Sequence, residues 1–312
     1  MSALSAHIGR TRDFYTRVLG LRLVIKTVNQ DEPSMYHLFF GDGAGSPGSD
    51  MTVFDMPRAA REHRGNNSIT LTTFRVSGEG TLEWWARRLS ELGVPNVGVT
   101  ARDGRGVVDF EDLEGTRLSL VDDGGDGDAH PWAESTVPAE RQIRGLGYPV
   151  ITVPELERTD RFLRQALGLA EVRRYRVEGT AYSAHVYAGT DRGVRGQVHV
   201  VVRDDLPPAR YGAGAVHHLA LRVPEGQPIA GWVARLDALG YHNSHVVDRH
   251  YFASVYVREP NGVLFELATD GPGFEVDGPL DAERLSLPPF LEPRRSEIEA
   301  SLAPLEAHSP TA

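Results

Sequence analysis

The feature that most constrains the fold of this chain is an internal repeat. Arg10–Leu21 reads Arg-Thr-Arg-Asp-Phe-Tyr-Thr-Arg-Val-Leu-Gly-Leu, and it aligns with Arg158–Leu169 at an offset of 148 residues (158 − 10). Further along, Gly115–Asp122 resembles Gly262–Thr269 at an offset of 147 residues (262 − 115). A repeat of this length predicts a duplicated fold and not a solenoid of short units.

Each copy of the repeat contains the same order of elements twice. Residues 10–19 are expected to form a helix, because Phe14, Val18 and Leu19 share one helical face and Gly20 can cap its C-terminus. Alternating apolar segments separated by Gly, Ser and Pro turns predict the strands around it. The pattern indicates an α+β fold of four βαβββ units, which lie near residues 1–60, 65–125, 143–205 and 213–270.

The repeat also divides the chain. We expect an N-terminal pair of units over residues 1–125 and a C-terminal pair over residues 143–270. The segment between them, 126–142, lies in a region rich in Gly, Asp and Pro and is interpreted as a linker. Residues 271–312 form a tail, with a Pro-rich segment followed by a short helix expected near Pro293–Leu302.

Composition excludes several classes of function. The net charge of the 312 residues is −10, which argues against nucleic acid as a partner, because a phosphate-binding surface needs clustered Lys and Arg. No apolar run approaches the roughly 18–20 residues of a membrane helix, and no signal peptide is expected. The chain has no cysteine, so thiolate ligands and disulfides are excluded, and a cytoplasmic location is expected. We therefore expect a small molecule as the partner.

Two strands of the fourth unit carry metal-type ligands where a core strand favours aliphatic residues. His217 and His218 stand in one strand and Glu266 in another, 48 residues after His218 (266 − 218). Burying an imidazole or a carboxylate is costly unless something pairs with it, so the two strands suggest a shared cation. At the positions of His218 and Glu266, the first copy of the repeat has Leu71 and Ser119. The ligand types thus belong to one copy alone, which favours function over fold.

Several segments together resemble the vicinal oxygen chelate superfamily, which includes glyoxalases, bleomycin resistance proteins and extradiol dioxygenases. They are Asp13–Leu23, Tyr36–Asp42, Gly45–Gly48, His217–Val223 and Asp248–Asp270. Within the superfamily, these segments and the tail sequence at residues 287–299 resemble the hydroquinone-type ring-cleaving dioxygenases. The resemblance implies that the four units pair into two cupped mixed-sheet halves.

The resemblance also implies a metal. Enzymes of that group hold one Fe(II) with two histidines and a glutamate, an arrangement that leaves coordination positions open for substrate and dioxygen. Carried over to this chain, the second histidine is His218 and the carboxylate is Glu266, with Mn(II) as an alternative to iron. His217, Arg249 and Tyr256 take catalytic roles by the same resemblance.

Substrate binding is assigned by the same resemblance. Ser2 is expected to bind substrate together with His217 and Arg249. Arg249 can offset the charge of a phenolate, and Tyr256 can donate to or accept from the reacting groups. Because adjacent residues of a strand point to opposite faces, we expect only one of His217 and His218 to face the site.

The chain departs from the family pattern at its first strand. The family's first histidine ligand precedes a Thr or Ser by two residues, and the helix register puts that hydroxyl residue at Ser2. The ligand would then fall immediately before Met1. Two explanations stay open: Met1 is an internal methionine of a longer reading frame, or the chain begins there and binds metal weakly.

The expected function is therefore an Fe(II)-dependent dioxygenase that opens the ring of a hydroquinone or a related dihydroxylated aromatic compound. Its partners are the small aromatic substrate and dioxygen. One alternative is a glyoxalase-type metal-dependent isomerase or hydrolase. Another is a small-molecule-binding protein, if Met1 is the true start. The oligomeric state is left open, with a homo-oligomer as one option.

Overall fold

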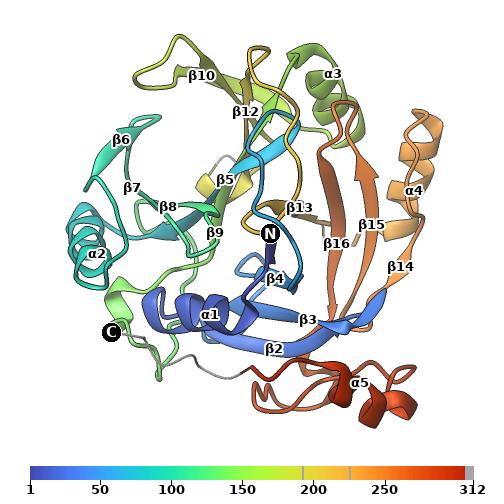
Figure 1. Ribbon diagram of the computed structural model, residues 1–312. Helices are drawn as coiled ribbons and strands as arrows, with labels where there is room; N and C mark the ends of the chain where they lie inside the picture. Colours follow the sequence, from blue (N-terminus) through green and yellow to red (C-terminus); the bar gives the residue numbers. More distant parts are fainter. Residues whose placement is uncertain (192, 225, 306–312) are drawn as a thin grey trace.

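The computed structural model describes residues 1–191, 193–224 and 226–305, and it contains four βαβββ units, as expected (Figure 1). The first unit consists of β1 (Ser2–Ser5), α1 (Ile8–Asp13) with η1 (Phe14–Val18), β2 (Arg22–Asn29), β3 (Glu32–Gly41) and β4 (Met51–Asp55). The second consists of β5 (Ser68–Val76), α2 (Glu79–Glu91), β6 (Thr100–Arg102), β7 (Arg105–Glu111) and β8 (Arg117–Asp122).

The second half repeats this order. The third unit consists of β9 (Leu146–Val153), α3 (Leu156–Arg161) with η3 (Phe162–Ala166), β10 (Ala170–Arg176), β11 (Ser183–Ala188) and β12 (Gln197–Val202). The fourth consists of β13 (Val216–Arg222), α4 (Ile229–Ala238), β14 (Val247–Asp248), β15 (Phe252–Arg258) and β16 (Leu264–Pro272).

The repeated helix segment has the same irregularity in both copies. In each, an α-helix widens into a π-helical turn, at Phe14–Val18 and at Phe162–Ala166. Gly20 then adopts a φ of +70°, which ends the first helix as expected. A Cβ at Gly20 would lie 2.5 Å from the Ser135 hydroxyl oxygen, so a larger residue there would displace the Ser135 side chain and strain the backbone.

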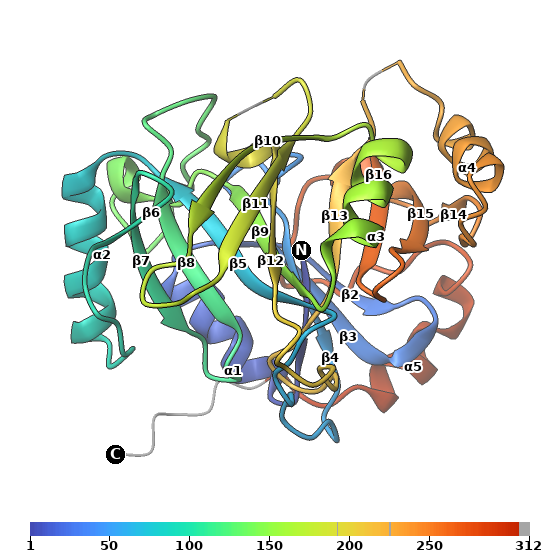
Figure 2. The same ribbon diagram turned by 90° about the horizontal axis from the view of Figure 1, so that it is seen from above.

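The pairing of the units differs from the expected pairing of consecutive units. The first strand of unit 1, β1, is antiparallel to β13 of unit 4, while β5 of unit 2 is antiparallel to β9 of unit 3. One cup therefore consists of units 1 and 4, and the other of units 2 and 3 (Figures 1 and 2). A single pair, Val216 opposite Ile69, joins the two cups between β13 and β5.

The physical reason lies in the connections between units. The segments after β4 and after β12 run side by side and form bridges between Arg61 and Ala213 and between His63 and Arg210. The chain thereby crosses from one cup to the other and back again. The repeat in the sequence defines each unit, but it holds no information about which unit edges meet.

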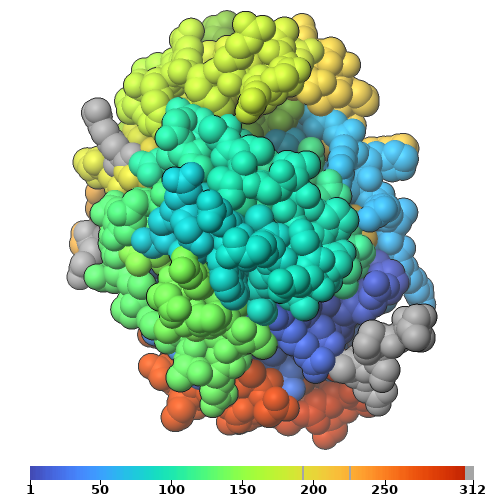
Figure 3. All heavy atoms as spheres, turned by 90° about the vertical axis from the view of Figure 1, so that its left-hand side faces the viewer, coloured from blue at the N-terminus to red at the C-terminus, as the bar shows by residue number. Residues whose placement is uncertain are grey.

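The segment interpreted as a linker is packed against the first unit. The Ser135 hydroxyl donates to the carbonyl of Gly20 at 2.7 Å, and the Gly43 amide donates to the carbonyl of His130 at 2.8 Å. The C-terminal part of this segment contains the short 3-10 helix η2 (Ala139–Arg141). Figure 3 shows the segment below unit 2, with unit 3 above and the tail along the lower edge.

The tail lies across the outside of unit 1. It contains the 3-10 turns η5 (Phe274–Asp277) and η6 (Glu292–Arg294) and the helix α5 (Arg295–Ser301), close to the helix expected at 293–302. Its buried side chains pack on Val28 and Tyr36 of strands β2 and β3; they are Leu285, Leu287, Leu291 and Ile298. Over the described residues, no helix is long and apolar enough to cross a membrane.

The cup of units 2 and 3 is filled by its own side chains. His199 is fully buried and stacks on Tyr148, with ring centroids 3.7 Å apart. One ring nitrogen of His199 lies 3.1 Å from the Tyr175 hydroxyl, and the other lies 3.0 Å from the Gln197 side-chain oxygen. Burial, with Arg173 and Arg102 adding to it, lowers the pKa of His199 well below its usual value.

This buried histidine predicts a pH-dependent stability. In the folded chain His199 stays neutral, whereas in the unfolded chain it binds a proton below about pH 6.5. The unfolded state therefore binds more protons as the pH falls from about 6.5 towards the folded-state pKa, and the free energy of unfolding drops by up to about 1.4 kcal/mol per pH unit. His199→Asn should flatten this slope in urea unfolding, while His242→Asn, at an exposed position, should not. Equal slopes in the two variants would contradict the assignment.

Candidate active site

The cup of units 1 and 4 encloses a cavity of about 250 Å³. Alternate residues of the strands face it, which follows from the two-residue period of a strand. From β4 these are Asp50, just before the strand, Thr52 and Phe54. The cavity also receives side chains from β3, β13, β15 and β16 and from the tail, so no single unit contains it.

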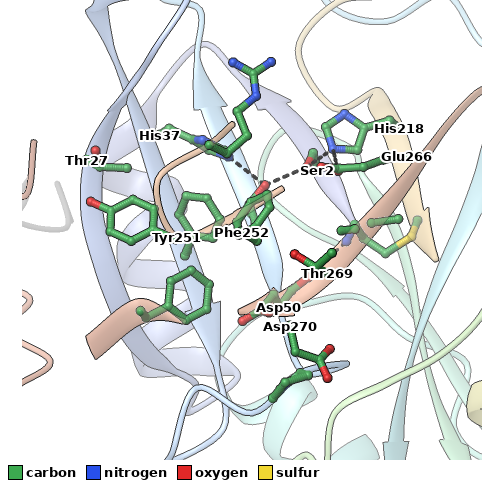
Figure 4. A pocket seen from close by; sticks show the side chains of 18 of the residues that line it. Ser2, Thr27, His37, Asp50, His218, Tyr251, Phe252, Glu266, Thr269 and Asp270 are labelled. Atoms are coloured by element: carbon green, nitrogen blue, oxygen red, sulfur yellow. Dashed lines mark hydrogen bonds and ion pairs between the residues drawn. The ribbon is translucent and has the colours of Figure 1, made fainter. Parts of the chain in front are cut away.

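His218 and Glu266 face each other in this cavity. The Nε2 atom of His218 lies 2.9 Å from Oε2 of Glu266, and both side chains are about 95 % buried. Strand pairing brings them together: β13 is parallel to β16, and Ala220 is opposite Glu266. The two metal-type residues singled out in the sequence are therefore neighbours in the structure (Figure 4).

Glu266 is held by three groups. Ser254 donates a short hydrogen bond to Oε1, and the Tyr256 hydroxyl donates to the same oxygen at 3.0 Å. Burial alone would raise the pKa of Glu266, but His218 and the two hydroxyls outweigh burial and lower that pKa to about 2. The carboxylate is therefore ionised and oriented. Ser254 was missed in the sequence, although it shares a strand face with Tyr256.

Ser2 reaches the same pair from the first strand. Its Cα is paired with that of His218 across β1 and β13, and its hydroxyl lies 2.7 Å from His218 Nε2. A chain of hydrogen bonds continues from Ser2 to the Thr52 hydroxyl at 2.7 Å and on to Nε2 of His37 at 2.9 Å. His37 and Thr52 were not recognised as site residues, because each stands in a segment that reads as packing.

His217 lies behind His218 and is not among the residues that line the cavity. The two Nδ1 atoms are 2.9 Å apart, so one of them carries a proton and the other accepts it. When His218 donates through Nδ1, loss of the proton that its Nε2 shares with Glu266 would leave Nε2 with the lone pair that a metal ligand requires. Burial and the neighbouring His218 lower the pKa of His217 to about 4. The contact places His217 against the ring of His218, and its expected role in substrate binding stays a prediction.

Arg249 lies over Tyr256. Its guanidinium carbon is 5.3 Å from the ring centroid, and Nε donates to the phenol oxygen at 3.3 Å. Its other end pairs with Asp31 at 3.1 Å. Burial raises the pKa of Tyr256, and the Glu266 carboxylate adds to that effect. The phenol therefore keeps its proton and remains a hydrogen-bond donor at neutral pH.

His218 and Glu266 are the candidate metal ligands of this cavity. Over residues 1–191, 193–224 and 226–305, no group of three or more His, Cys, Asp or Glu side chains is placed to hold a metal ion. His218 and Glu266 fit two positions of the two-histidine, one-carboxylate arrangement, since their donor atoms converge in one cavity. The described residues alone do not complete the set of three.

Comparisons with known proteins identify the family. Residues 145–267 match the model of the Glyoxalase/Bleomycin resistance protein/Dioxygenase superfamily. The chain is 46 % identical over 98 % of both chains to a Bacillus subtilis protein named "Putative ring-cleaving dioxygenase MhqA". The chain therefore belongs to this superfamily, and the fold expected from the resemblance is confirmed.

Further relatives carry related names. The "Chlorohydroquinone/hydroquinone 1,2-dioxygenase" of Sphingobium indicum is 32 % identical, with 81 % of this chain and 79 % of that protein covered. A crystal structure of a "putative dioxygenase" from Bacillus subtilis superimposes with a TM-score of 0.88 at 32 % identity, over 99 % of this chain and 97 % of the other. Glyoxalase I from Zea mays shares the fold, with a TM-score of 0.65 at 15 % identity over 86 % and 90 % of the chains.

The contact between His218 and Glu266 predicts a large coupling in stability. With metal removed by a chelator, His218→Leu should lower the free energy of unfolding by about 3–5 kcal/mol, because it leaves the buried carboxylate without its partner. Adding Glu266→Leu to that variant should recover most of the loss. Urea unfolding of the two single variants and the double variant measures the coupling. Additive losses would show that the two groups do not interact.

Proposed function

We propose that the chain is an Fe(II)-dependent dioxygenase that cleaves the ring of a hydroquinone or a related dihydroxylated aromatic compound. The observation that carries this proposal is the convergence of the buried His218 and Glu266 side chains, through Nε2 and Oε2, in one cavity. The names of relatives that align with most of the chain support it. Mn(II) is the alternative metal.

The surrounding side chains support a role in handling a phenol. Tyr256 stays protonated and can donate to a substrate oxygen, and Arg249 places a positive charge at that phenol, where it favours a substrate phenolate. Ser2 presents a hydroxyl beside His218, and His217 holds the ring of His218 from behind. When bound, the iron would supply Lewis acidity and electron transfer to dioxygen.

Strand geometry predicts where a donor joined ahead of Met1 would point. Ser2 faces the cavity, so a residue joined ahead of Met1 would face it too, because side chains on one face recur every two residues. Continuing the register, that position lies opposite Ala220, and Ala220 is itself paired with Glu266. A histidine there would face both His218 and Glu266. This is the position that the family register indicated independently.

The geometry predicts a gain in metal affinity from one added residue. A short leader that ends in histidine, joined to Met1, should raise the affinity for Fe(II) or Mn(II) at least tenfold over the same leader ending in alanine. The physical reason is the third donor facing His218 and Glu266. Anaerobic calorimetric titration measures the affinity, and His218→Ala in the histidine-leader chain should abolish the gain. Equal affinities with the two leaders would contradict the register.

Ring cleavage itself is tested by oxygen uptake. The histidine-leader chain, loaded with Fe(II) without oxygen, should consume dioxygen when hydroquinone is added, and its Glu266→Gln variant should lose at least 100-fold in rate. No uptake by an iron-loaded chain would reject the proposal. Anaerobic turnover of a thiohemiacetal would instead favour a glyoxalase-type isomerase.

A further inference from the structure

One end of the cavity is an aromatic wall. The rings of Phe39, Phe252 and Phe274 all line the cavity and contact one another edge to face. Their centroids are 5.3 Å apart for Phe39 and Phe274, and 6.4 Å apart for each of the other two pairs. Tyr251 extends the wall, with its ring 5.8 Å from that of Phe274.

Ser2, His218 and Glu266 lie apart from this wall (Figure 4), whereas the ring of His37 packs on Phe39, with centroids 4.2 Å apart. In Figure 4, Ser2, His218 and Glu266 gather on one side of the cavity, while Tyr251 and Thr27 lie on the other. A ring whose hydroxyl is held by the polar groups would therefore direct a substituent towards the aromatic wall. Apolar groups gain free energy on leaving water for such a surface.

Phe274 differs from the other members of the wall in its origin. Phe39 belongs to β3 and Phe252 to β15, whereas Phe274 lies in η5 of the tail, outside the four units. The tail is fixed at this point, because the Gly273 amide donates to the Tyr251 carbonyl at 2.8 Å. The Tyr251 hydroxyl in turn lies 2.7 Å from that of Ser286.

The tail is also anchored beyond this point. The Ser286 amide donates to the Lys26 carbonyl of β2 at 2.8 Å, and His250 pairs with Asp277 at 2.6 Å. With the apolar anchors that pack on Val28, these contacts hold the tail on both sides of η5. Phe274 is therefore a fixed wall, and its size limits what the cavity admits.

The charged residues that line the cavity indicate which kind of ring substituent it can accept. Of the two arginines among the described lining residues, Arg222 faces Asp270 and Arg249 faces Asp31. Asp50 also lines the cavity, and burial raises its pKa to about 8. Asp31, Asp50 and Asp270 all line the cavity, and Arg249 and Arg222 are paired with two of them, so the surroundings disfavour an anionic substituent and the wall suits an uncharged, apolar group.

We propose that Phe274 determines specificity, by limiting the size of the apolar substituent on the aromatic ring. This inference rests on the proposed ring-cleaving function. The proposal predicts that hydroquinone and methylhydroquinone are accepted and that a branched alkyl substituent is disfavoured. The tail thereby contributes to substrate choice although it lies outside the repeated units.

The test compares variants at this position across a series of substrates. Phe274→Ala should raise kcat/KM for tert-butylhydroquinone relative to hydroquinone at least tenfold, since space for one or a few methyl groups changes discrimination about 10- to 200-fold. Phe274→Trp should shift the same ratio in the opposite direction. The matched control is Val276→Ala, because Val276 lies in the same turn, is 42 % exposed and does not line the cavity. Its ratio should equal that of the parent chain.

A second measurement separates this inference from the proposed function. Anaerobic calorimetry of hydroquinone, methylhydroquinone and tert-butylhydroquinone measures size selection by binding, without turnover. If no chain consumes oxygen but Phe274→Ala shifts the binding ratio at least tenfold, size selection holds and the dioxygenase proposal fails. If the chain with Phe274 intact cleaves hydroquinone, but neither Phe274 variant shifts the preference for tert-butylhydroquinone over hydroquinone in kcat/KM or in binding, the role of Phe274 is overturned. Thermal melts identify any variant that fails to fold, and the other variant then decides.

Discussion

The site depends on one strand pairing, that of β1 with β13. It brings Ser2 opposite His218 and closes units 1 and 4 into one cup, although some two hundred residues separate these strands in the chain. Without it, His218 and Glu266 would be two polar residues in one half of a sheet. With it, the first strand, β4 and the tail complete a buried cavity around them.

The two cups show how one duplicated fold can hold two different interiors. The cup of units 2 and 3 is filled by stacked rings and paired charges, among them His199 on Tyr148 and Arg102 on Asp109. The cup of units 1 and 4 keeps a cavity, and charged side chains are among the residues that line it. The difference resides in side chains, because the strand order is the same in all four units. The candidate site therefore depends on one pairing of units and not on the unit itself.

The tail both packs on the outside of unit 1 and contributes a side chain to the cavity. Its apolar residues pack on β2 and β3, and its Phe274 reaches the cavity beside Phe39. The contacts that hold the tail also set the position of the aromatic wall. The polar end of the cavity, by contrast, is held by strand pairing and by the hydrogen bonds to Glu266.

The sequence alone determined the four units, the helix capped by Gly20, and the choice of His218 and Glu266. These are local matters, set by periodicity, turn residues and polar groups within apolar strands. Only the tertiary structure decided that unit 1 pairs with unit 4, that His217 lies behind His218, and that His37, Thr52 and Phe274 reach the cavity. Each of these depends on contacts between residues far apart in the chain, which hydrophobic periodicity within a segment does not encode.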